Sequence, residues 1–162
     1  MTSTLTRRIL LMLAVALLAG CAASERMRKE GLELVEQGRV EEGLSKLEEA
    51  TREDPKDVKA RTSLTFTRER VVARMLETAD RALATNNLAE AETLYRRVQS
   101  IEPRNERALA GLRSIERRGT VDDLVKQGQA ALKKGEVDAA ALAQESAAMI
   151  SPRHTGVAKL KA

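Results

Sequence analysis

The chain has 162 residues, of which 32% are charged and only 1% are aromatic, and its formal net charge at pH 7 is +4. Basic and acidic residues alternate along the chain, and Phe66 and Tyr95 are the only aromatic residues, so no nucleic-acid surface is expected. Ala, Leu, Glu, Arg and Lys dominate, which favours helices over a β-sandwich or β-barrel.

The first 20 residues are typical of a secretory signal peptide. Arg7 and Arg8 form a positive start, and residues 9–18 form an apolar stretch too short to span a bilayer. The segment ends in Leu-Ala-Gly-Cys, with Cys21 the only cysteine of the chain. This ending resembles the box of a bacterial lipoprotein signal, which implies cleavage between Gly20 and Cys21 and covalent lipid, palmitate included, on Cys21. An ordinary signal peptide with an incidental cysteine is the alternative.

The residue after the cysteine bears on the destination of the chain. Ala22 stands where many inner-membrane lipoproteins carry an aspartate. The resemblance therefore implies a lipid anchor in the outer membrane, with the rest of the chain facing the periplasm. No other cofactor is expected.

Beyond the leader, apolar residues recur at helical spacing, and Gly, Asn and Pro separate the helical stretches. We expect helices over residues 24–37, 40–51, 57–85, 88–101, 106–134 and 137–150, with Pro55, Pro103 and Pro152 as stops. Gly119 predicts a kink or break in the fifth helix, because Thr120 would cap a restarted helix. Val58 and Leu132 belong to the apolar stripes of their helices. The residues after Pro152 are expected to begin a further helix.

One motif of eighteen residues occurs three times without a gap, over residues 38–55, 86–103 and 135–152. Small or apolar residues precede the three prolines at the same separations of twelve, seven and five positions: Gly31, Gly43 and Ala50; Ala79, Ala91 and Val98; Gly128, Ala140 and Ala147. Small residues at these offsets let two antiparallel helices approach closely. The pattern resembles the tetratricopeptide repeat.

The resemblance implies an all-α, tetratricopeptide-like stack of helical hairpins, an α-solenoid. Repeats at about 24–57, 72–105 and 121–154 would lie in a domain over 25–155, with a linker at 21–24 and a tail at 156–162. The prolines lie 48 and 49 residues apart instead of 34, so each first helix gains about fourteen residues. Gln144 replaces the bulky Leu47 and Tyr95 of the other copies, which leaves the packing of the third repeat open. A helical bundle without tetratricopeptide geometry is the alternative.

The leader and the repeats together are similar to the amino-terminal region of certain secretins, the outer-membrane channels of type II secretion and type IV pilus systems. The stretches that carry this similarity are residues 31–50 and 91–108. The resemblance implies a periplasmic scaffold without the pore-forming β-domain, either a truncated product or a free-standing lipoprotein.

Residues for catalysis are not evident. His154 is the only histidine and is expected to be solvated instead of a metal ligand or base. The Glu41-Glu42 and Glu48-Glu49 pairs lie on a polar helix face, where Arg39 and Lys46 offer ion pairs. No glycine-rich phosphate loop is present. We therefore expect no enzyme, and a hydrolase is the remote alternative.

A surface for protein partners remains. In tetratricopeptide stacks the first helices line a groove, and by spacing this implies the following candidates: Leu32, Val35, Glu36, Leu76, Asp80, Leu83, Gln129 and Lys133. Ala84, Val125 and Leu132 fall on the same faces. The alternative, preferred for Leu76, Leu83 and Leu132, is that the apolar members form the core between hairpins. The sequence thus predicts a non-catalytic scaffold serving a secretin-type secretion or pilus system, or alternatively a free-standing lipoprotein in envelope or cell-wall assembly.

Overall fold

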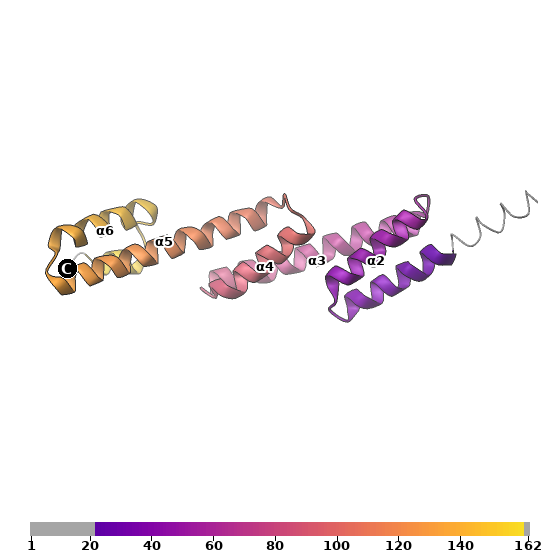
Figure 1. Ribbon diagram of the computed structural model, residues 1–162, viewed down its shortest axis with the longest axis horizontal. Coiled ribbons are helices and arrows are strands. Elements are labelled where there is room, and N and C mark those ends of the chain that lie inside the picture. The colour runs from indigo at the N-terminus through magenta and orange to yellow at the C-terminus, as the bar shows by residue number, and fades with distance from the viewer. Residues whose placement is uncertain (1–21, 161–162) are drawn as a thin grey trace, which may run out of the picture. The chain divides into compact units, whose positions relative to one another are not determined.

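The computed structural model describes residues 22–160, and the elements in that range are helices joined by short turns (Figure 1). The all-α class expected from the composition is confirmed for these residues. The chain divides into two compact units, Met1–Arg74 and Met75–Ala162. The boundary falls inside α3 (Val58–Ala84), so this helix contributes residues to both units. The predicted signal peptide and the predicted lipidation site, Cys21, lie outside the described residues.

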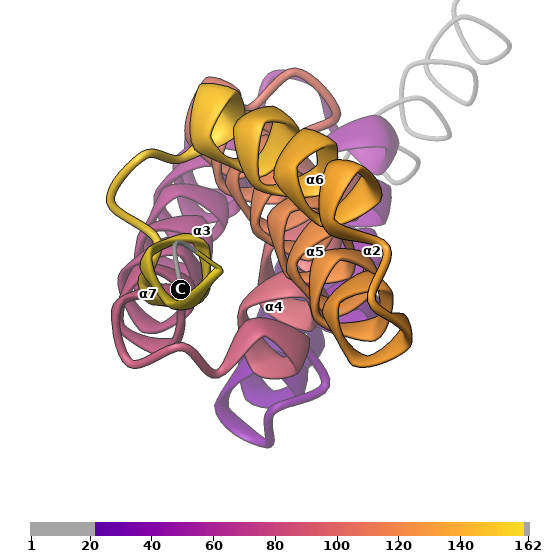
Figure 2. The same ribbon diagram turned by 90° about the vertical axis from the view of Figure 1, so that its left-hand side faces the viewer.

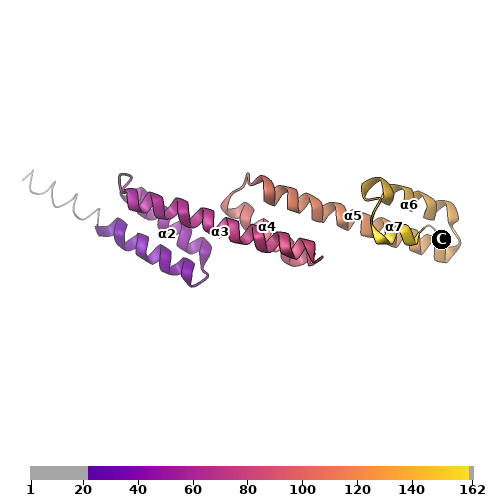
Figure 3. The same ribbon diagram turned by 180° about the vertical axis from the view of Figure 1, so that it is seen from behind.

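Unit 1 is built from antiparallel helices. The helix of residues 22–36 is followed by α2 (Val40–Glu53), which folds back along it, and the first part of α3 folds back along α2 (Figures 1 and 3). Apolar residues of α2 at spacings of three and four positions share one buried face: Val40, Leu44, Leu47 and Ala50. Arg68 of α3 joins this hairpin through an ion pair with Glu48, with 2.6 Å between Nη2 and Oε1.

Glycines set the close contact between the first two helices. A Cβ atom on Gly31 would lie 2.8 Å from the carbonyl oxygen of Gly43, and a Cβ atom on Gly43 would lie 2.6 Å from that of Gly31. Neither distance is tolerable for a carbon atom, so any side chain would force the helices apart. The small residues at these positions therefore act as the sequence predicted.

Unit 2 contains the end of α3, α4 (Leu88–Ile101), α5 (Glu106–Lys134), α6 (Val137–Ile150) and α7 (Thr155–Lys159). Tyr95 of α4 is 1% exposed, and its ring occupies the space over Gly111 of α5. Further along α5 a second apolar cluster joins α5, α6 and α7 (Figure 2): Val121, Val125, Ala147, Val157 and Leu160.

The three copies of the eighteen-residue motif start with the same turn. Gly38, Asn86 and Gly135 are the described residues with positive φ, at 83°, 62° and 78°. In each turn the next residue donates its backbone N–H to a carbonyl five positions back, as Asn87 does to Ala82 at 2.8 Å. This is the Schellman arrangement, which requires a left-handed residue and so favours Gly or Asn. The turn signals in the sequence are thus confirmed.

The three copies of the motif also end with the same backbone geometry before a proline. The residues directly before the prolines, Asp54, Glu102 and Ser151, have non-helical backbones with φ between −130° and −149°. The proline ring disfavours the helical region for the preceding residue, so each short helix ends there. The predicted helix ends agree with the structure to within about two residues, the ordinary scatter of such boundaries.

The predicted break at Gly119 is wrong. α5 runs unbroken through this residue, and the Thr120 hydroxyl donates to the carbonyl oxygen of Glu116 at 3.1 Å instead of capping a new helix. One glycine costs a helix about 1 kcal/mol relative to alanine, which the hydrogen bonds and packing of the flanking turns outweigh. The predicted start of α5 is confirmed, since the Asn105 side chain accepts the backbone N–H of Ala108 at 3.0 Å.

Two apolar residues of the predicted stripes lie on the surface, Val58 at 64% exposure and Leu132 at 39%, and for Leu132 this contradicts the preferred core assignment. The third hairpin packs mainly through alanines, with Ala140, Ala143 and Ala147 buried and Gln144 half-buried. Small residues thus replace the bulky anchor that Leu47 and Tyr95 provide in the other hairpins.

Candidate functional site

The structure begins one residue after the proposed lipid-bearing Cys21. Residues 22–24 are helical, so the expected linker at 21–24 overlaps the helix. Ser24 is fully buried, and its Oγ lies 2.8 Å from Asp57 Oδ2 and 3.2 Å from the carbonyl oxygen of Ala50. The Ser24 hydroxyl is the main cause that holds the pKa of Asp57 below its usual range. The start of the described chain is therefore tied to the turn between α2 and α3.

The predicted groove residues differ in accessibility. In unit 1, Leu32 and Val35 are half-buried and Glu36 is exposed, and Val35 lies against Gly43 within the hairpin. In unit 2, Leu76 is buried and Leu83 is half-buried, in line with the core alternative for both. Gln129 and Lys133 are exposed on α5, and Ala84 is exposed at the end of α3. Val125 belongs to the buried cluster with Val121.

Asp80, one of the predicted groove residues, is already engaged inside unit 2. Tyr95 donates its hydroxyl to Oδ1 of Asp80, and Arg107 donates its Nε to Oδ2 at 2.8 Å. Burial of the ring and the hydrogen bond to Asp80 raise the pKa of Tyr95 to about 12. This carboxylate thus ties α3, α4 and α5 together, and a partner would have to compete with two internal donors.

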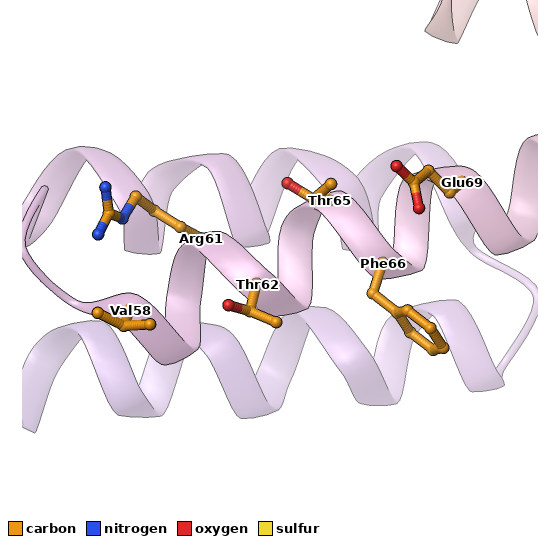
Figure 4. A pocket seen from close by; sticks show the side chains of 6 residues that line it. All are labelled: Val58, Arg61, Thr62, Thr65, Phe66 and Glu69. Atoms are coloured by element: carbon orange, nitrogen blue, oxygen red, sulfur yellow. The ribbon is translucent and has the colours of Figure 1, made fainter.

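A different surface stands out on the first part of α3. Six side chains line an open pocket of about 380 Å³ on one face of this helix (Figure 4): Val58, Arg61, Thr62, Thr65, Phe66 and Glu69. Val58 is 64% exposed and Phe66, the only phenylalanine of the chain, is 63% exposed. We call this the α3 face.

Helix geometry explains why these residues point outward. Ala60, Thr67 and Val71 are buried and mark the inner side of this part of α3. Phe66 lies one position from Thr67, about 100° around the helix, so its ring cannot join that interior. Exposing a phenylalanine forgoes the roughly 1.5–3 kcal/mol that burying it would contribute.

On α5, polar residues stand at the positions of the two exposed apolar residues of the α3 face. Counted from Pro55 and Pro103, Val58 corresponds to Glu106, Thr65 to Arg113 and Phe66 to Ser114. Both helices are elongated, to 27 residues in α3 and 29 in α5, so an exposed apolar pair is not a requirement of the fold. The sequence signal that could have found this surface is the lone phenylalanine lying off the apolar stripe of its helix.

A second open pocket on the helix of residues 22–36 is lined mostly by charged side chains, among them Glu25, Lys29 and Glu33. Between residues 22 and 160 no group of three or more His, Cys, Asp or Glu side chains is arranged to hold a metal ion. Within the same range no helix combines the length and hydropathy needed to cross a membrane.

His154, expected to be solvated, is half-buried. Its Nδ1 accepts the backbone N–H of Gly156 at 3.3 Å and so caps α7, while Nε2 lies 3.2 Å from Oδ1 of Asp122. The ion pairs expected on α2 are present, Arg39 with Glu42 and Lys46 with Glu49.

Comparison of the chain with protein-family models, with curated proteins and with solved structures finds no match. The resemblance to tetratricopeptide proteins and secretins therefore rests on the sequence motifs alone.

Proposed function

We propose that this chain is a non-catalytic scaffold module of the tetratricopeptide type, tethered by lipid on Cys21 to the periplasmic side of the outer membrane. It contacts a component of a secretin-type secretion or pilus system. The lipoprotein box before Cys21 supports the tether. Three hairpins with the same left-handed turn and the same pre-proline stop support the repeat assignment.

The observation that carries the binding role is the α3 face. Val58 and Phe66 expose apolar surface where the equivalent residues of α5 are Glu106 and Ser114. Large exposed apolar side chains at a defined place mark interaction surfaces, and an aromatic anchor commonly dominates the binding energy. The α3 face is therefore the proposed contact with the protein partner.

Site-specific photocrosslinking tests this proposal in the native envelope. A photoreactive phenylalanine analogue at position 66 would be compared with the same analogue at position 114, its counterpart on α5. A secretin, pilus or secretion-platform protein crosslinked from position 66 only would support the proposal. Cell-wall or other envelope factors would instead favour the free-standing lipoprotein, and equal products from both positions would refute the α3 face as the contact.

The tether is tested separately. Alkyne-labelled palmitate should be incorporated into the full-length protein and should be absent from Cys21→Ser. Labelling that persists in the variant, or is absent from both proteins, would refute the lipid anchor without bearing on the α3 face.

A further inference from the structure

α6 exposes its largest apolar side chains. Leu142 is 66% exposed and Met149 is 76% exposed, while Ala140, Ala143 and Ala147 form the side buried against unit 2. Figure 2 shows α6 running along α5 at the margin of this unit. The helix thus packs inward through alanines and presents its long apolar side chains outward, the reverse of an ordinary amphipathic surface helix.

The other short helices show that the fold does not require long apolar side chains on the outer side of the helix. At the position of Leu142, α2 has Ser45 and α4 has Thr93. At the position of Met149, they have Arg52 and Ser100, and all four of these residues are exposed. The apolar outer face is therefore particular to α6 and has no role in the packing of the hairpins.

The spacing on this face is that of a helix-pairing seam. Asp138, Leu142, Glu145 and Met149 follow one another at steps of four, three and four positions, which places them in one row along α6. Asp138 also lies in the first turn of α6, where an acidic residue stabilises the helix end. Glu145 lies mid-helix between Leu142 and Met149, where the helix end gives it no such role.

The charges on the row determine what can cover it. Both acids are exposed, and neither has a hydrogen bond or ion pair to another described residue. A second copy of α6 in parallel would set Glu145 against its own counterpart. An antiparallel copy would set Leu142 and Met149 against carboxylates. Neither arrangement joins apolar to apolar and acid to base, so self-association is disfavoured.

We propose that the α6 row binds an amphipathic helix of a protein partner. The heptads of this helix carry an apolar residue at one core position and Lys or Arg at the other. Its apolar residues cover Leu142 and Met149, and its basic residues meet Glu145 and Asp138. This site is separate from the α3 face and does not depend on the lipid anchor.

Two synthetic peptides provide the test. Both are helices of four heptads with leucine at one core position, and the other core position is lysine in the probe and glutamate in the control. Fluorescence anisotropy would measure their binding to the full mature chain carrying Cys21→Ser. The lysine peptide should bind, and the glutamate peptide should bind about tenfold more weakly or not at all.

Variants locate the binding. The double variant Leu142→Thr with Met149→Ser introduces the residues of α4 at these exposed positions. It should lower the affinity for the lysine peptide about tenfold or more, while the helical circular dichroism signal stays unchanged. Glu145→Gln should reduce the preference for lysine over glutamate, whereas Phe66→Ser should leave it intact. No binding of the lysine peptide at about 1 mM protein, or binding unaffected by the double variant, would overturn the proposal.

Discussion

Replacing Tyr95 by phenylalanine removes one oxygen atom from the centre of unit 2. The ring is 1% exposed and stays packed over Gly111, so no sizeable cavity forms. The lost interaction is the hydrogen bond from the hydroxyl to the Asp80 carboxylate, and hydrogen bonds to charged groups contribute about 1.5–3 kcal/mol. We expect the free energy of unfolding at pH 7 to fall by about 2 kcal/mol, with Arg107 still paired to Asp80.

The same hydroxyl makes this difference depend on pH. The pKa of Tyr95 is raised from 10.0 to about 12 in the folded chain. Because the raised pKa belongs to the folded state, its contribution is complete below pH 10 and is lost as pH rises toward 12. At about 1.4 kcal/mol per pH unit, the loss amounts to roughly 2–3 kcal/mol, comparable to the whole advantage over phenylalanine.

Urea unfolding followed by circular dichroism measures both effects. The two proteins share every other titrating group, so their difference isolates Tyr95. The difference should be close to constant between pH 7 and pH 9 and should shrink toward zero near pH 12. A difference that is absent at pH 7, or one that persists undiminished at pH 12, would refute the role given to this hydrogen bond.

Four further substitutions test other features of the chain. Gly111→Ala places a Cβ atom 2.3 Å from the Tyr95 ring and should lower stability by about 1–3 kcal/mol in urea unfolding. Gly119→Ala on the same helix meets no atom within 4 Å and should raise stability by about 0.5–1 kcal/mol, whereas a loss would argue for a strained backbone there. Ser24→Ala should destabilise unit 1 by about 1–2 kcal/mol at pH 7. Because the pKa of Asp57 is lowered in the folded chain, the stability lost with Ser24 should diminish as pH falls below about 4 in acid titrations of both proteins. Cys21→Ser should move the protein from the membrane fraction to the soluble periplasmic fraction, and retention in membranes would count against lipid anchoring.

The helix boundaries could be predicted because the decisive signals are local. Gly38, Asn86 and Gly135 permit the left-handed turn, and the residue before each proline is excluded from the helix. Gly119 lacks such support, since a single glycine without a following proline or a cap does not end a helix. Local signals therefore predicted the helix ends correctly. They failed at Gly119, where the cost of a glycine inside a helix is small.

The surfaces could not be predicted in the same way. Periodicity shows which residues of a helix share a face, but it does not show whether a neighbour covers that face. Val58 lies on the predicted apolar stripe of its helix, yet it is 64% exposed. Asp80 was expected to be available to a partner because its internal donors, Tyr95 and Arg107, lie 15 and 27 positions away in the chain. Contacts at such separations require the fold itself.

The hairpin architecture has a kinetic consequence. Each short helix packs on helices close to it in the chain, and the interhelical hydrogen bonds described above span no more than 33 positions. A chain with such local contacts closes small loops only, so its entropy barrier to folding is low, and helical proteins of this kind fold in microseconds to milliseconds. Each hairpin can therefore fold as soon as its own residues are available, without waiting for the residues that follow it.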